Sequence, residues 1–166
     1  MVKTTDLFLS HNWGVGQKNH RKVIKINEEL KKLGYVTWFD EEDMAGNTQK
    51  KMAEGIENTR CFVAFLTKEY HEKVNEGGTN DNCRAEFDYA TTQNIPFVGV
   101  VLDSSMKNPK QWEGNIDFTL SKYLYIDMSG DLDDSTYLSN QLKLLAKELE
   151  SREIVPNQTP SRIGKN

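Results

Sequence analysis

The sequence predicts an α/β fold, namely a flavodoxin-like, doubly wound sheet of five parallel strands in the order 2-1-3-4-5 with helices on both faces. Short apolar runs alternate along the chain with longer amphipathic segments, which is the pattern of strands joined by crossover helices. Five such runs are present, and right-handed crossovers between them favour this order, with a switch point between the first and third strands. The carboxyl ends of those two strands should therefore border a ligand crevice.

The predicted strands are runs of aliphatic, aromatic and β-branched residues, each bounded by polar, glycine or proline residues. They are Leu7–Leu9, Tyr35–Phe39, Cys61–Leu66, Phe97–Leu102 and Tyr123–Ile126.

Helical periodicity is clearest in two segments. Aliphatic residues recur every three or four positions over Val23–Leu33, where Gly34 ends the pattern, and again over Leu138–Leu149. Weaker periodicity predicts two more helices, over Thr48–Asn58 and Asn82–Thr92.

Three further segments show no such period. We predict a loop over residues 68–81 and irregular structure over 103–121. Residues 152–166 carry two prolines and are predicted to be a flexible tail or linker, which leaves a domain over residues 1–151. No internal repeat is present.

Length, charge and composition exclude several classes of partner and site. The 166 residues suit one domain, and a net charge of −4 argues against nucleic acid as the main partner. No apolar stretch is long enough to span a membrane and the N-terminal residues lack the core of a secretory signal, so we expect a cytoplasmic protein with no membrane partner. The cysteines, Cys61 and Cys83, and the three histidines have no metal-ligand spacing, so we predict reduced thiols and no metal.

The predicted crevice contains a lone carboxylate. Glu86 follows the third strand, near the start of the Asn82–Thr92 helix, while Ser10 and Trp13 follow the first strand. We expect these three side chains to face one another across the switch point. A structural explanation stays open, because an acidic residue in the first turn of a helix is stabilised by the helix dipole by about 0.3–1 kcal/mol.

Nucleotide-binding motifs fit the sequence poorly. Gly14-x-Gly16-x-x-Asn19 follows a strand and precedes a helix, as a dinucleotide fingerprint does, but its third glycine is replaced. A Walker sequence is absent. A response regulator would need acidic residues after the first strand, whereas Asp6 precedes it. A dehydrogenase-like domain is also disfavoured, because no segment remains for a substrate domain.

Four motifs occur in order along this pattern. They are Asp6-Leu-Phe-Leu-Ser-His11, Leu33-Gly-Tyr-Val-Thr-Trp-Phe-Asp-Glu-Glu-Asp-Met-Ala-Gly46, Ile56-Glu-Asn-Thr-Arg-Cys-Phe-Val-Ala-Phe-Leu-Thr67 and Cys83-Arg-Ala-Glu86. Their order and spacing, over about residues 5–150, resemble a TIR (Toll/interleukin-1 receptor) domain. Trp112 and the closing Tyr123-Leu-Tyr-Ile-Asp127 are similar to those of stand-alone TIR domains from protists and invertebrates. The resemblance independently implies the flavodoxin-like fold.

The resemblance implies one of two functions. Some TIR domains cleave NAD⁺ at the nicotinamide–ribose bond, in immune or stress signalling, and others are non-enzymatic scaffolds. Enzymatic members carry a glutamate where this chain has Glu86, so we expect an NAD⁺ glycohydrolase, with NAD⁺ as substrate and no cofactor. The products would be nicotinamide and either ADP-ribose or cyclic ADP-ribose. Enzymatic members often have a tryptophan where this chain has Asn82, so nicotinamide would stack on Trp13 or Trp38 instead.

The same resemblance predicts the rest of the site and a partner. Residues expected to contact the substrate surround the two crevice loops: Ser10, His11, Asn12, Trp13, Trp38, Asp40 and Asn82. In TIR domains the loop after the second strand also mediates head-to-tail self-association, which here implicates Met44, Ala45 and Gly46. Such a heterologous contact builds open strands of subunits.

Overall fold

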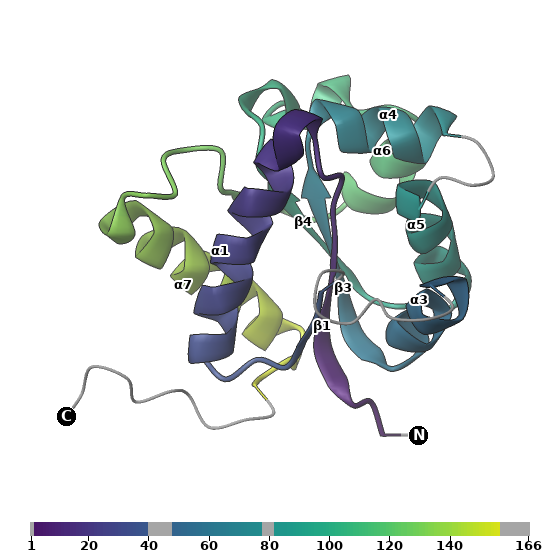
Figure 1. Ribbon diagram of the computed structural model, residues 1–166, viewed down its shortest axis with the longest axis horizontal. Helices are drawn as coiled ribbons and strands as arrows, with labels where there is room; N and C mark the ends of the chain where they lie inside the picture. Colours follow the sequence, from purple (N-terminus) through teal and green to yellow (C-terminus); the bar gives the residue numbers. More distant parts are fainter. Residues whose placement is uncertain (1, 40–47, 78–81, 157–166) are drawn as a thin grey trace.

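A computed structural model of the protein describes residues 2–39, 48–77 and 82–156. Its sheet has five parallel strands in the order β2-β1-β3-β4-β5, which confirms the predicted fold (Figure 1). The strands are β1 (Thr5–Ser10), β2 (Thr37–Trp38), β3 (Thr59–Leu66), β4 (Phe97–Val101) and β5 (Ile126–Asp127).

The two edge strands differ in extent from the prediction. Of the predicted Tyr35–Phe39 strand only Thr37 and Trp38 pair with β1, and the last strand is Ile126–Asp127 rather than Tyr123–Ile126. An edge strand has a neighbour on one side only, so an apolar run marks where the chain is buried without fixing which residues join the ladder. The central β3, buried along nearly its whole length, lies within one or two residues of its prediction.

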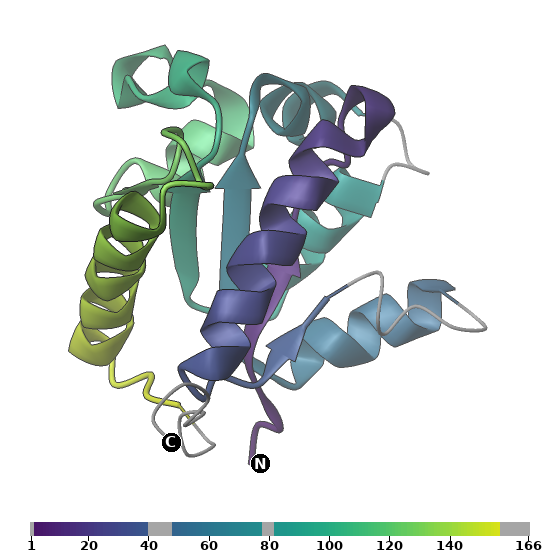
Figure 2. The same cartoon turned by 60° about the vertical axis from the view of Figure 1, so that its left-hand side comes forward.

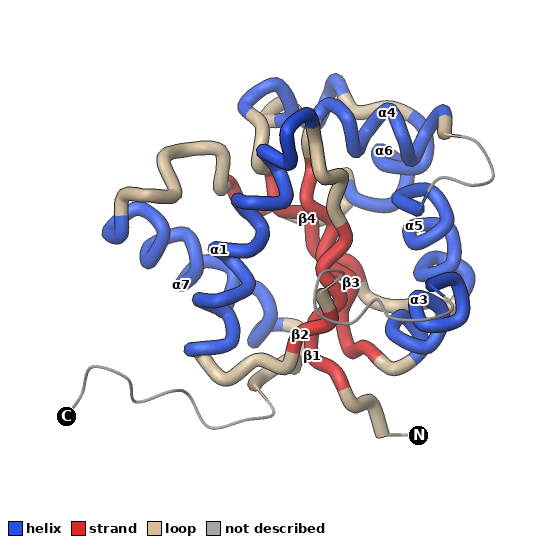
Figure 3. The backbone as a smooth tube through the Cα atoms, in the orientation of Figure 1, coloured by secondary structure: helices blue, strands red, loops and turns tan. Residues whose placement is uncertain are grey.

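Two helical layers enclose the sheet (Figures 2 and 3). α1 (Lys18–Lys32) and α7 (Ser135–Ser151) pack on one face, in a core with Leu7 and Leu9 of β1. The other face packs, together with Phe8 of β1, against α3 (Thr48–Glu57), α4 (Lys68–Glu76), α5 (Asn82–Thr92) and α6 (Gly114–Leu120). Successive residues of β1 therefore face different layers, as expected for a strand.

Two helices were not predicted. α4 occupies most of the segment predicted to be a loop, and α6, with the 3₁₀ turns Ser104–Met106 and Pro109–Gln111, lies in the segment predicted to be irregular. Each helix is short and buries few apolar residues, one turn apart: Tyr70 and Val74 in α4, Ile116 and Leu120 in α6. Two such positions are too few to establish a helical period in the sequence.

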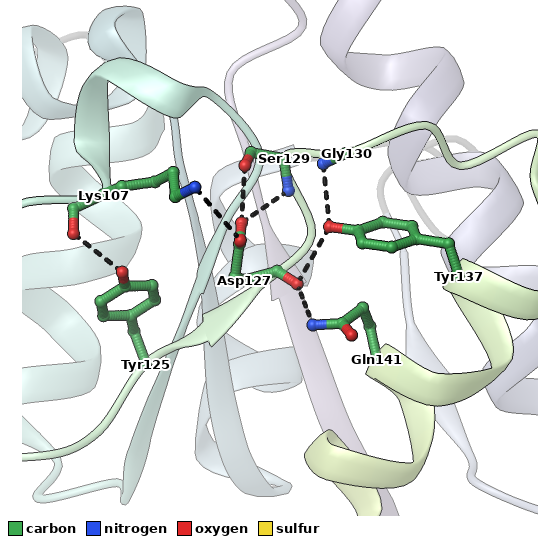
Figure 4. Close-up of polar contacts among 7 residues, drawn as sticks. All are labelled: Lys107, Tyr125, Asp127, Ser129, Gly130, Tyr137 and Gln141. Atoms are coloured by element: carbon green, nitrogen blue, oxygen red, sulfur yellow. Dashed lines mark hydrogen bonds and ion pairs between the residues drawn. The ribbon is translucent and has the colours of Figure 1, made fainter.

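A polar cluster anchors the end of β5 to α7 (Figure 4). Gln141 donates to the Asp127 carbonyl oxygen at 2.6 Å, and Ser129 Oγ donates to the Asp127 carboxylate at 2.6 Å. Burial raises the pKa of Asp127, but hydrogen bonds from Ser129 and the charge of Lys107 outweigh it and leave that pKa below its ordinary value. These contacts hold a strand that pairs through only two residues.

The segment that follows α7 packs against the domain as far as it is described. Ile154 is buried in the core beside α7, and Arg60 donates hydrogen bonds to the carbonyl oxygens of Glu153 and Val155. Residues 157–166 of the predicted tail lie outside the described residues. Across the described ranges, no helix combines the length and apolar character needed to cross a membrane.

Gly55 in α3 makes a close approach to Trp38. A Cβ atom at this position would lie 2.7–2.9 Å from three atoms of the indole ring. We expect Gly55→Ala to destabilise the domain, because overpacking costs about 1–3 kcal/mol, whereas the gain in helix propensity is only about 1 kcal/mol. Urea unfolding of the two proteins measures the difference. Adding Trp38→Phe should relieve the clash, and a double variant no more stable than Gly55→Ala would contradict this explanation.

Candidate active site

The loop after β1 is folded tightly against the start of α1. Gly14 has a φ of 77°, in the left-handed region, and its N–H group donates to Asn12 Oδ1 at 2.9 Å. Asn19 in turn donates to Glu69 Oε1 of α4 at 2.9 Å. These bonds fix the loop between two helices at the carboxyl edge of the sheet, where a ligand crevice is expected.

Ser10 connects two other elements at this edge. It ends β1 and is buried, and its hydroxyl donates to Glu86 Oε1 of α5 at 2.6 Å. The hydroxyl oxygen of Ser10 also lies 2.9 Å from the hydroxyl oxygen of Tyr70 in α4. The structure thus brings together the predicted residues Ser10 and Glu86, and it adds Tyr70, which the sequence did not indicate. Glu86 is only 2% exposed and lies beyond the first turn of α5.

A stack of four rings joins the loop after β1 to α1 and to Phe39, which lies in the core that α1 and α7 cover. Trp13 stacks on His20 of α1 with ring centroids 3.8 Å apart, and His20, His11 and Phe39 are mutually stacked at 5.0–5.4 Å. His11 Nε2 and His20 Nδ1 are also hydrogen-bonded at 2.7 Å. Trp13 is 40% exposed and is therefore the outermost ring of this stack.

His11 is held in its neutral form. Burial and the neighbouring His20 lower the pKa of His11 from 6.5 to about 3. Its Nδ1 atom is buried and has no hydrogen-bond partner among the described residues. His11 therefore supplies an uncharged imidazole to the interior, and no positive charge near neutral pH.

Cys83 joins the two clusters. This residue, one helical turn before Glu86, lies with its Sγ atom 3.7 Å from the carbonyl oxygen of His11 and 4.0 Å from Asn12 Nδ2. Position 83 thus links α5 to the loop after β1. The other cysteine, Cys61, is enclosed in β3, and burial raises the pKa of its thiol to about 12.

Of the remaining predicted residues, the structure describes Trp38 and Asn82. Trp38 is half-buried and stacks on Phe8 with ring centroids 4.4 Å apart, so its indole is part of the packing beside α3. Asn82 is exposed at the start of α5. Asp40 and the assembly residues Met44, Ala45 and Gly46 lie outside the described residues. Within the described ranges, no group of three or more His, Cys, Asp or Glu residues could hold a metal ion.

Comparison with known proteins identifies the family. The sequence matches the family described as TIR domain over residues 7–143, which is most of the chain. This chain is a TIR domain. No curated protein sequence matches it.

Three solved structures illustrate the likeness in fold. The TIR domain of the Toll-related receptor TRR-2 from Hydra magnipapillata is 11% identical with a TM-score of 0.59, covering 89% of this chain and 99% of that one. A prokaryotic SEFIR domain is 16% identical with a TM-score of 0.59, covering 86% and 98%. The TIR domains of the activated Roq1 resistosome are 16% identical with a TM-score of 0.57, covering 88% and 99%. At these identities the likeness concerns the fold alone.

Two residues of the site, Tyr70 and His20, escaped prediction. Tyr70 sits in a helix whose short apolar pattern gave no period, and His20 lies just before the recognisable period of α1. The spacing Ser10, His11, Trp13, His20 did place several polar and aromatic residues around one strand end. This grouping of aromatic and polar residues along the sequence could have indicated a cluster of stacked rings, but only the fold shows which rings are in contact.

Proposed function

We propose that this TIR domain cleaves the bond between nicotinamide and ribose in NAD⁺, with Glu86 as the catalytic carboxylate. The observation that supports it most is the burial of Glu86 at the carboxyl edge of the sheet, with Oε1 2.6 Å from Ser10 Oγ. Burying a carboxylate is costly unless it is hydrogen-bonded. A role confined to stabilising the helix dipole would need an acid in the first turn of α5, and that turn contains none.

The reaction requires little beyond a carboxylate. When the bond from ribose C1′ to the nicotinamide nitrogen breaks, the electron pair goes to the ring nitrogen and nicotinamide leaves as a neutral molecule. No general acid is needed, in contrast to a typical two-carboxylate glycosidase. Positive charge develops at C1′, where Glu86 can stabilise it electrostatically or attack it to form an ester.

The second half of the reaction sets the product. Water adds to C1′ and releases a proton, giving ADP-ribose. A ribose hydroxyl of the same molecule can add instead and lose its proton, giving a cyclic product. An adenine ring nitrogen can also add, and the proton is then lost from the adenine amino group. Glu86 serves both outcomes in the same way, because each begins with the same cationic ribosyl centre.

Trp13 is proposed to bind a base of the substrate. One face of its ring is covered by His20, while the 40% exposure of the side chain leaves ring surface accessible. We expect Trp13→Ala to raise KM about tenfold, with a smaller effect on kcat, because stacking a base on an aromatic ring contributes about 1–3 kcal/mol. Steady-state kinetics with NAD⁺ measure both constants, and Trp13→Phe should recover most of the affinity. An unchanged KM in Trp13→Ala would exclude this role.

Self-association is proposed to complete the site. By family resemblance, Asp40 borders the crevice and Met44, Ala45 and Gly46 contact a neighbouring subunit. The Roq1 TIR domains, which share this fold, occur in an activated resistosome. If the substrate binds between Glu86 of one subunit and that loop of the next, the rate per molecule should rise with protein concentration.

The test is nicotinamide release from NAD⁺ by the purified TIR domain over a range of protein concentrations. Release together with ADP-ribose or a cyclic product, at a specific rate that rises with concentration, is the expected result. Release at a constant specific rate would retain the activity and exclude the assembled site. No release even at high concentration and with a crowding agent would instead favour a non-enzymatic scaffold.

A further inference from the structure

The hydroxyl group of Ser10 connects Tyr70 to Glu86. Ser10 Oγ lies 2.6 Å from Glu86 Oε1 and 2.9 Å from the Tyr70 hydroxyl oxygen. Serine has one hydroxyl proton, and an ionised carboxylate can only accept hydrogen bonds. Since the proton of Ser10 is donated to Glu86, the second contact is a hydrogen bond only if Tyr70 donates to Ser10. The chain of donors therefore runs from Tyr70 through Ser10 to Glu86.

Tyr70, the first donor in this series of hydrogen bonds, is fixed in the core. Tyr70 is fully buried among the apolar residues that α3, α4 and α5 place on this face of the sheet. Its N–H group donates to Thr67 Oγ1, the cap of α4, at 3.1 Å. Ser10 is equally constrained, because it pairs in register with Ala64 of the central strand β3. The backbones that carry the two hydroxyls are therefore held by the sheet and by a capped helix.

The geometry at Glu86 follows from these constraints. A glutamate side chain has three rotatable bonds, so its carboxylate has no fixed direction unless other groups hold it. The hydrogen bond from Ser10 restrains the position of Oε1 and so limits the directions that the carboxylate can take. A 2.6 Å contact to a carboxylate is typical of a charge-assisted hydrogen bond, and donation from Tyr70 strengthens it by polarising the Ser10 hydroxyl.

We propose that Tyr70 is a positioning residue for the NAD⁺-cleaving reaction, acting on Glu86 through Ser10. This inference rests on the proposed function. Tyr70 touches neither substrate nor reacting atoms in this proposal, and its hydroxyl serves to direct the carboxylate toward ribose C1′ and to keep it ionised. Hydrogen bonds donated to a carboxylate favour its charged form.

The test compares the wild type with Tyr70→Phe, Ser10→Ala and the double variant. Tyr70→Phe removes one hydroxyl and keeps the ring, so we expect kcat to fall about fivefold to tenfold, as for the loss of one hydrogen bond, with KM nearly unchanged. The acidic limb of the pH profile of kcat should move to higher pH. If Tyr70 acts through Ser10, the double variant should be no slower than Ser10→Ala alone.

Tyr89→Phe is the matched control. Tyr89 lies on α5, as Glu86 does, but its hydroxyl donates to Glu57 on the surface of the domain. The same chemical change there should leave kcat and its pH profile as in the wild type. Equal effects of the two tyrosine variants would show that hydroxyl loss acts through stability and would overturn the proposal. So would additive effects of Tyr70→Phe and Ser10→Ala.

A spectroscopic readout separates this inference from the proposed function. In protein labelled with ¹³C at the glutamate carboxyl carbons, the Glu86 signal is assigned by its absence from Glu86→Gln and then titrated with pH. We expect its midpoint to be higher in Tyr70→Phe than in the wild type and in Tyr89→Phe. An unmoved midpoint overturns the inference alone, while a moved midpoint without any nicotinamide release overturns the proposed function and the catalytic part of the inference.

Discussion

Replacing Glu86 by glutamine should reduce nicotinamide release from NAD⁺ at least 100-fold. The substitution removes the negative charge that opposes the developing positive charge at ribose C1′, and loss of one such stabilising group typically lowers kcat by about 10²–10³-fold. The charge acts in a buried setting, since the side chain is 2% exposed, so solvent weakens it little. The measurement is kcat and KM for both proteins at equal concentration, with KM expected to change little.

The structure also predicts that Glu86→Gln stays folded. The glutamine amide oxygen can accept the hydrogen bond that Ser10 donates to Oε1, so the contact with Ser10 survives. Thermal unfolding should therefore give nearly the same Tm. The matched control is Glu72→Gln, which makes the same chemical change at an exposed position of α4 and should retain full activity. Activity in Glu86→Gln above a tenth of the wild-type level would contradict a catalytic role.

The sequence predicted the parts of this fold that are buried along their length. β3 is enclosed by strands and by both helical layers, so nearly every residue is apolar and the run is unmistakable. The sequence of α1 keeps a helical period over about three turns because the helix lies along the sheet. Where an element buries only two residues, as α4 buries Tyr70 and Val74, the sequence carried no such pattern. Strand order was predictable because the handedness of crossovers leaves few alternatives.

For the candidate site, the sequence predicted where individual residues lie along the chain but not which side chains meet in space. The motifs placed Ser10 at the end of the first strand and Glu86 in a helix after the third, and the fold brings the two side chains together. Nothing local to Tyr70 or His20 marks them, since their roles depend on which side chains meet after folding. Trp38 illustrates the opposite case, because it was selected for its chemistry while its surroundings, Phe8 and Gly55, make it a packing residue of the described structure.

The burial of neutral His11 should make the stability of the domain sensitive to acid. Its pKa is about 3 in the folded protein and ordinarily 6.5. Above pH 6.5 both folded and unfolded forms are neutral at this position, and stability is unaffected. As the pH falls below 6.5 the unfolded chain takes up a proton that the folded protein does not, so the free energy of unfolding decreases by about 1.4 kcal/mol per pH unit.

This loss of stability is large on the scale of a single domain. Between pH 6.5 and pH 3.5 it amounts to about 4 kcal/mol, against a typical total of about 5–15 kcal/mol. The measurement is the free energy of unfolding in urea from pH 4 to pH 8, for the wild type and His11→Gln. Because acidic groups also contribute, the quantity of interest is the difference between the two slopes. The slope of the free energy of unfolding against pH should be smaller in the variant, by an amount that corresponds to nearly one proton taken up on unfolding. Glutamine keeps a polar contact to His20 but does not titrate. Parallel curves would show that His11 is not the residue that couples folding to pH.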